Sequence, residues 1–118
     1  MPHSRAPGRR AVPQTTRWTV RARLERHAKD EWDGRCRAID VRFRGRFAYV
    51  DALPVLDGGP DQSPIHLCRL GYLGQAERWQ FAFYTYSGDS YEPSCLPSGS
   101  FTGSPEEAFD CAAFTYLS

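Results

Sequence analysis

The chain has 118 residues, among them 7 Phe, 6 Tyr and 3 Trp, and its formal net charge is +1 at neutral pH. This length predicts one domain with an ordinary core, which is rich in aromatic side chains here. No apolar stretch approaches the length of a membrane span, and residues 1–14 lack the apolar middle of a secretory signal. We therefore expect neither a membrane protein nor a secreted one, and the cytoplasm is the expected compartment.

Charge is divided unevenly along the chain. Residues 1–46 contain thirteen Lys or Arg against five acids, whereas residues 47–118 contain two Arg against nine acids. Such asymmetry is typical of nucleic-acid contact or of complementary self-association. The alternative is that the two parts pack together and neutralise each other within the domain.

The first 14 residues form a basic segment with several prolines. This composition predicts a flexible tail over 1–14, followed by a single α+β domain over 15–118.

The cysteines give no sign of a metal centre. No two of them form a Cys-x-x-Cys pair, so free buried thiols are expected. Four side chains are conceivable zinc ligands, at a spacing that matches no common zinc pattern: His66, Cys68, Cys95 and Cys111. We expect no metal and no cofactor.

Residues 15–34 fit two kinds of element. Val20, Leu24 and Ala28 are spaced four apart, as on one face of a helix, and three oppositely charged pairs share that spacing: Arg21/Glu25, Glu25/Lys29 and Arg26/Asp30. Thr15 or Thr16 offers an N-cap and Gly34 a stop, so we predict a helix over 17–32. Alternation of apolar and basic residues over 17–24 leaves a strand as the rival.

Residues 37–55 predict a β-hairpin. Ile39, Val41 and Phe43 alternate with Asp40, Arg42 and Arg44, so the two sets point to opposite faces. A three-residue turn over 44–46 with a central Gly would return the chain.

This turn would place Phe43 opposite Phe47 and Val41 opposite Tyr49. Both returning aromatic residues would then lie on the apolar face, and the arginines would gather on the other face and around the turn.

Further strands are predicted over 65–74, 78–87 and 91–97, with a loop over 56–64. The last of these strands contains Pro93 and Pro97, so it is expected at an edge of the sheet. Residues 104–117 predict a helix, because Ser104, Pro105 and Glu107 form a capping box with proline at the first position. The fold class is therefore α+β: an antiparallel sheet of four or five strands with an N-terminal and a C-terminal helix in two layers, the helices on one face.

No catalytic centre is evident, and no catalytic residue is assigned. His27 is expected to pair with Asp30 or Glu31, and His66 lies on a strand with no base or nucleophile at a recognisable spacing. The segment GSFTG (99–103) precedes a helix, where backbone amides can bind an anion, but we interpret it as a turn that leads into the capping box.

The arginines are the better indication of function, because a guanidinium group bonds two phosphate oxygens at once. The predicted nucleic-acid-binding residues are Arg37, Arg42, Arg44 and Arg46 of the hairpin with Arg17 and Arg21 of the first helix. Arg23 and three tail arginines add to this set, and the possible stacking residues are Tyr84, Tyr86 and Tyr91.

Two stretches, RFRGRFAYVDA (42–52) and LPSGSFTGSPEEAFDCAAFTYL (96–117), resemble a group of short uncharacterised bacterial proteins. The likeness covers most of residues 18–117 and implies a stable stand-alone domain, with no particular activity.

A local likeness over about ten residues concerns the HicB-type antitoxins, in which a strand, a glycine, a Thr or Ser, a second glycine and a Glu-Ala helix start follow one another. The matching residues are Gly99, Thr102, Gly103, Ser104, Glu107 and Ala108, with a shorter spacing between the glycines than in that family. This resemblance implies a small protein that blocks a toxin or binds DNA. The order of elements is also similar to that of double-stranded-RNA-binding domains, but the last helix starts with the acidic SPEE and not with lysines.

Three functions remain open. The first is a small non-enzymatic binding module that contacts nucleic acid through its Arg-rich hairpin. The second is a protein–protein adaptor or antitoxin-like partner that recognises an acidic protein surface, with a homodimer as one form of it. The third is a small enzyme or ligand-binding protein with a pocket near His66, Tyr84 and Cys95.

Overall fold

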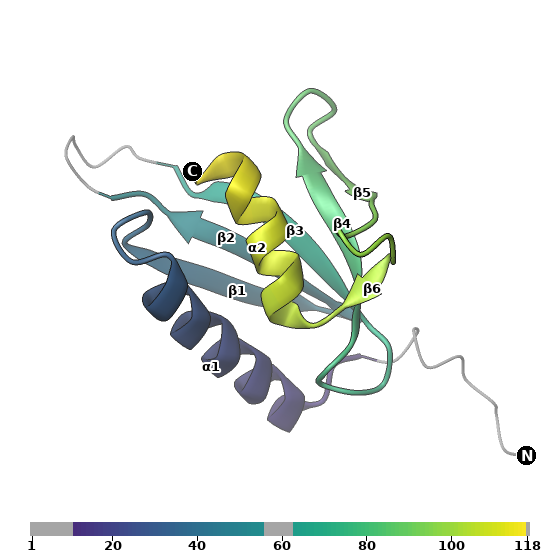
Figure 1. The fold of residues 1–118 in the computed structure, drawn as a ribbon. Coiled ribbons are helices and arrows are strands. Elements are labelled where there is room, and N and C mark those ends of the chain that lie inside the picture. Colours follow the sequence, from purple (N-terminus) through teal and green to yellow (C-terminus); the bar gives the residue numbers. More distant parts are fainter. Residues whose placement is uncertain (1–10, 56–62, 118) are drawn as a thin grey trace, which may run out of the picture.

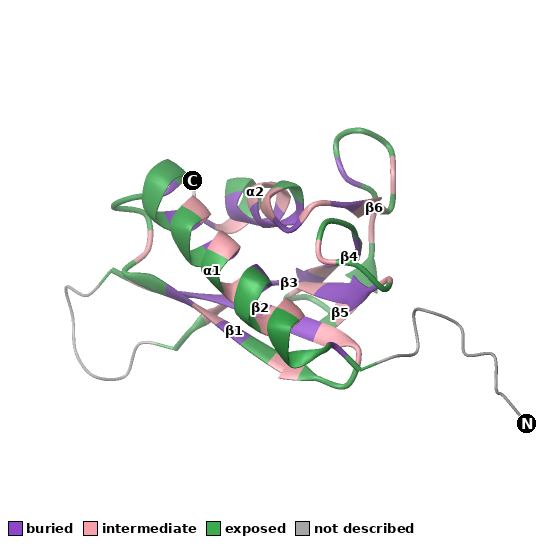
Figure 2. Cartoon of the chain, turned by 90° about the horizontal axis from the view of Figure 1, so that it is seen from below, coloured by how far each residue is buried: buried purple, intermediate pink, exposed green. Residues whose placement is uncertain are grey.

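The computed structural model describes residues 11–55 and 63–117. Two helices pack on one face of a six-stranded antiparallel sheet, as Figures 1 and 2 show, so the predicted two-layer α+β fold is confirmed. In chain order the elements are α1 (Gln14–Glu31), β1 (Ala38–Arg44), β2 (Phe47–Leu53), β3 (Ile65–Tyr72), β4 (Trp79–Thr85), β5 (Ser90–Pro93), β6 (Thr102–Gly103) and α2 (Pro105–Tyr116).

The sheet is a simple meander. Its strands lie in the order β1-β2-β3-β4-β5, each antiparallel to the next, and the short β6 pairs with the beginning of β4. β5 is an edge strand, as its prolines predicted. β6 was not expected, because GSFTG was interpreted as a turn.

α1 is a helix, and a strand over 17–24 is therefore wrong. It begins three residues before the predicted start, behind Pro13 and without the expected threonine cap. Its buried residues are Val20, Leu24 and Ala28, the row spaced four apart. Because burial of this row against the sheet stabilises the helix, no capping side chain is required.

The expected ion pairs within α1 do not form among the described side chains, and two other side chains of the helix, Arg23 and His27, bind acids of α2. Arg23 binds the carboxylate of Glu106 with two hydrogen bonds of 2.8 and 2.7 Å. Although burial acts to raise it, the hydrogen bond from Arg23 holds the pKa of Glu106 below its usual value. This bidentate contact joins the two helices across 83 residues of sequence.

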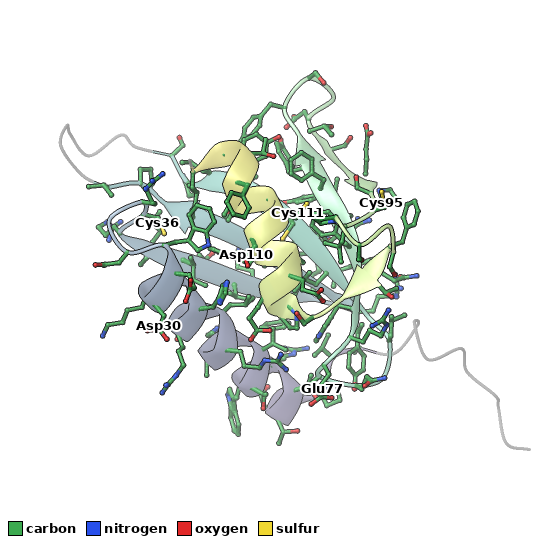
Figure 3. The ribbon with its side chains drawn as sticks, in the orientation of Figure 1. Asp30, Cys36, Glu77, Cys95, Asp110 and Cys111 are labelled. Carbon is green, nitrogen blue, oxygen red and sulfur yellow. The ribbon has the colours of Figure 1, made fainter. Side chains whose placement is uncertain are left out.

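A second contact between the helices corrects the prediction for His27. Its partner is Asp110 of α2, at 2.7 Å, and not Asp30 or Glu31. Trp32 donates an indole hydrogen bond of 2.9 Å to the same carboxylate oxygen. Figure 3 shows Asp110 on the side of α2 that is turned toward α1.

The hairpin forms, but its predicted register is wrong. Phe43 lies opposite Ala48, Val41 opposite Val50, and Arg44 opposite Phe47. The connection is a two-residue turn of Gly45 and Arg46, with a positive φ of 60° at Gly45. Glycine at the first central position is the pattern of a type II′ hairpin turn.

The shift in register exchanges the two faces of β2. Ala48, Val50 and Ala52 are fully buried beneath the helices, so Phe47 and Tyr49 point to the opposite face, together with Arg42. A bulge between Val50 and Asp51 breaks the pairing of β2 with β3.

The core lies between the sheet and the helices, where Figure 2 shows buried positions on the facing sides of both layers. Its largest fully buried side chains include Trp79 of β4 and Phe109 of α2. α2 begins with the predicted capping box: Glu107 N–H donates to the hydroxyl of Ser104, and Ser104 N–H donates to the carboxylate of Glu107. The carboxylate of Glu107 therefore accepts the hydrogen bond of the Ser104 amide, which is then no longer free to bind an anion.

Part of the segment assigned to the tail belongs to the domain. Val12 is buried, and its N–H donates to the carbonyl of Gly45 at 3.2 Å. Among residues 11–55 and 63–117, neither helix combines the length and the apolar character needed to cross a lipid bilayer.

The turn yields a stability prediction. Gly45→Ala should lower the free energy of unfolding by about 1–2 kcal/mol, because a side chain strains a backbone at positive φ. Arg44→Ala, one residue earlier and exposed, should change it by less than about 0.5 kcal/mol. Urea denaturation of the two variants measures both, and equal losses would contradict the positive φ at Gly45.

Candidate nucleic-acid interface

α1 and α2 cover one face of the sheet and leave the other face open (Figure 2). The side chains of this open face come from alternate positions of β1, β2, β4 and β5. On β3 the register shift opposite Val50 and Asp51 brings His66 and Arg69, three positions apart, to the same face. We call this surface the aromatic–arginine face. It consists of Arg42, Phe47, Tyr49, Asp51, His66, Arg69, Tyr84 and Tyr91.

The rings of this face form a continuous row across β2, β5 and β4. The centroid of Tyr49 lies 6.2 Å from that of Phe47 and 5.3 Å from that of Tyr91, and Tyr91 lies 4.9 Å from Tyr84. Neighbouring rings meet edge to face. The contacts between neighbouring rings fix the geometry of the row. Phe47, Tyr49 and Tyr91 are only partly buried, so the row exposes ring surface on the open side of the sheet.

Guanidinium groups lie over these rings. Arg69 is 4.2 Å from the centroid of Phe47 and 5.7 Å from that of Tyr91. Arg46 is 4.5 Å from the ring of Phe47, and Arg42 is 5.9 Å from that of Tyr49. The rings attract the guanidinium groups and hold them beside the row. Because a ring carries no negative charge, the positive charge of each arginine is not neutralised by this contact.

A buried carboxylate lies under the face. Asp51 is only 3% exposed, and it accepts hydrogen bonds of 2.9 Å from Arg42 and 2.9 Å from Nδ1 of His66. Arg42 also contacts Asp40 at 3.2 Å. An ionised carboxylate is stable at this depth only with such partners, so Asp51 fixes the positions of Arg42 and His66.

Two tyrosines of the face, Tyr84 and Tyr91, have raised pKa values. A hydrogen bond to Asp89 raises the pKa of Tyr84 to about 12, and burial raises the pKa of Tyr91. These two tyrosines are therefore uncharged at neutral pH and add no negative charge to the face.

Two hollows flank the row. The larger, of about 480 Å³, is lined by Arg42, Arg44, Tyr49, His66, Tyr84 and Tyr91 among others. The smaller, of about 270 Å³, is lined by Arg46, Phe47, Arg69 and Gly71 among others.

Three of the predicted arginines belong to this region. Arg42 and Arg44 line the larger hollow, and Arg46 lines the smaller one. Arg42 is paired with acids, whereas Arg44 is exposed and forms no ion pair with any carboxylate in the described ranges.

The other three predicted arginines lie elsewhere. Arg17 and Arg21 extend from α1 to the ring of Phe43 on β1, at 5.6 and 5.3 Å, and donate hydrogen bonds to backbone carbonyls. Arg37 is exposed beside the end of α1. The structure does not bring these three onto the aromatic–arginine face.

Sequence reasoning missed Phe47, Tyr49, Asp51 and Arg69 as site residues. The first two were assigned to the core because of the incorrect register. Arg69 could have been noticed as an isolated basic residue within an apolar strand, since a charge there must reach the open face.

The pocket suggested near His66, Tyr84 and Cys95 exists in part. The rings of His66 and Tyr84 are 4.7 Å apart and share the larger hollow. Cys95 is exposed and is not part of its lining. His66, Cys68, Cys95 and Cys111 do not form a metal-binding group, and none of three or more ligands occurs in the part of the chain that the structure describes.

All four cysteines are free thiols, of which only Cys68 is fully buried. Burial raises the pKa of Cys36, Cys68 and Cys111, so these thiols are poor nucleophiles at neutral pH.

Comparisons of the chain with protein-family models, with curated proteins and with solved structures found no match.

The buried carboxylate gives a second prediction. Asp51→Ala should lower the free energy of unfolding by about 1–3 kcal/mol, because Arg42 and His66 lose their acceptor. Asp40→Ala removes a half-exposed partner of the same arginine and should lower it by less than about 1 kcal/mol. Urea unfolding compares the two, and a smaller loss for Asp51→Ala than for Asp40→Ala would contradict the role given to Asp51.

Proposed function

We propose that the chain binds single-stranded nucleic acid across the aromatic–arginine face. The observation that carries the proposal is the row of neutral rings with guanidinium groups beside it, on a sheet face that neither helix covers. Bases stack on such rings whatever their sequence, and guanidinium groups contact the phosphates between them.

The rings best suited to stacking are Tyr49 and Tyr91. They adjoin each other at the centre of the row, and both are partly exposed. Phe47 is closely covered by Arg46 and Arg69 and is less available to a base. Two successive bases at the centre of the sheet would therefore be the minimal contact.

The charges favour a strand that runs along the hairpin side of the face. Arg44, Arg46 and Arg69 form no ion pair with any carboxylate of residues 11–55 and 63–117. The acids of this side are already bound, since Asp40 and Asp51 both contact Arg42. Phosphates then meet positive charge that the fold has not compensated.

A single strand fits better than a duplex, because the bases of a duplex are stacked on each other and cannot reach the tyrosines. The start of α2 offers no substitute duplex contact. Its acids are engaged in the protein, Glu106 with Arg23 and Glu107 in the capping box. The proposed compartment is the cytoplasm, where RNA single strands are abundant.

Binding tests the proposal directly. Fluorescence anisotropy with labelled twelve-nucleotide oligo-U and oligo-dT should show affinity that falls steeply between about 50 and 200 mM salt, and a duplex of equal length should bind more weakly. Tyr49→Ala and Tyr91→Ala should each remove about 1–3 kcal/mol of binding free energy. Arg44→Ala should weaken binding and reduce its salt dependence.

Trp18→Ala is the matched control, because Trp18 is an aromatic residue that is 60% exposed on the helix layer. It should leave affinity unchanged. Absence of strand binding at low salt, or equal losses in the Trp18 and Tyr49 variants, would refute the proposal. A chain that binds no strand but elutes as a homodimer would favour the adaptor function instead.

A further inference from the structure

The smaller hollow beside Phe47 is lined by two arginines and by no acidic residue. Arg46 and Arg69 both lie over the ring of Phe47, at 4.5 and 4.2 Å from its centroid. No Asp or Glu lines this hollow, whose volume is about 270 Å³. Burial and the nearby charge of Arg69 lower the pKa of Arg46, so the two cations repel each other where no anion is present.

One polar atom of Arg46, a residue that lines the hollow, has no partner. The Nε of Arg46 is buried and has no hydrogen-bond partner. Among the described residues, no other buried side-chain nitrogen or oxygen lacks one. Buried donors in folded proteins are almost always satisfied, so an exception calls for an explanation. An anion in the hollow would supply the acceptor if the side chain of Arg46 turned its Nε toward it.

The position of Arg46 is built into the fold. Its Nη2 donates to Oε1 of Gln80 at 2.6 Å, and its carbonyl accepts from Tyr72 N–H at 2.9 Å. Gly71 lies beneath this contact. A Cβ there would come within 3.0 Å of Oε1 of Gln80 and 3.3 Å of Nη2 of Arg46, so glycine leaves the room that the arginine occupies.

We propose that Arg46 and Arg69 bind a phosphate monoester in this hollow. On a nucleic-acid strand, and here the inference rests on the proposed function, the group is the terminal phosphate. A monoester carries up to two negative charges at neutral pH and matches two guanidinium groups, whereas a phosphodiester inside a strand carries one. The face would therefore bind strand ends in preference to strand interiors.

Anisotropy with twelve-nucleotide oligo-U tests this preference. Three forms are compared: one with a 5′-phosphate, one with a 3′-phosphate and one with neither. One phosphorylated form should bind about tenfold more tightly than the unphosphorylated strand. Arg69→Gln should abolish the difference, and Arg46→Lys, which keeps the charge but loses Nε, should reduce it. Arg26→Gln removes one exposed charge from α1 and should preserve it.

Titration of uridine monophosphate, followed by the Nε–Hε NMR signal of Arg46, separates failure of the inference from failure of the proposed function. Equal binding of all three strands, with no shift of that signal, would overturn the phosphate site and leave strand binding intact. A shift of that signal without binding of any strand would support the phosphate site and overturn the proposed function. No strand binding and no shift would overturn both.

Discussion

The register of β1 with β2 is the constraint on which the open face of the sheet depends. A two-residue turn at Gly45 pairs Arg44 with Phe47, and every later residue of β2 follows from that pairing. Small side chains, Ala48, Val50 and Ala52, then lie under the helices and allow close packing. A shift by one residue would instead turn Asp51 toward the helix layer, away from Arg42 and His66. Only the observed register buries the small side chains of β2 and also leaves Asp51 beside Arg42 and His66. The turn at Gly45 and the packing of the core therefore favour the same register.

The elements that could be predicted from the sequence are those governed by local chemistry. The row of Val20, Leu24 and Ala28 predicted α1, and the capping box at Ser104 predicted α2. The register could not be predicted in this way, because FAYV (47–50) offers apolar residues on both of its alternating faces. Either face could have been assigned to the core. The stretch Arg-Gly-Arg is also compatible with both a two-residue and a three-residue turn.

Contacts between distant residues were the other part that sequence reasoning could not supply. Neighbours along α1 were the natural partners for His27, yet its acid comes from α2, 83 residues away. In the same way Arg69 reaches Phe47 only because β2 and β3 pair. The basic and acidic parts of the chain do neutralise each other, but only locally: Arg23 is paired with Glu106, and Arg42 with Asp51. The two arginines beside Phe47 form no ion pair in the part of the chain that the structure describes.

The hydrogen bond from Arg21 to the carbonyl of Val41, at 2.9 Å, affects how the edge of the sheet can pair with another molecule of the protein. β1 is a terminal strand of the sheet, and its free backbone groups are a template on which a strand from a neighbouring molecule can add. Arg21 occupies one of those groups with a side chain of the same molecule and sets a bulky cation beside it. A strand that added to β1 at this point would have to break that bond, so the contact disfavours pairing between molecules at Val41.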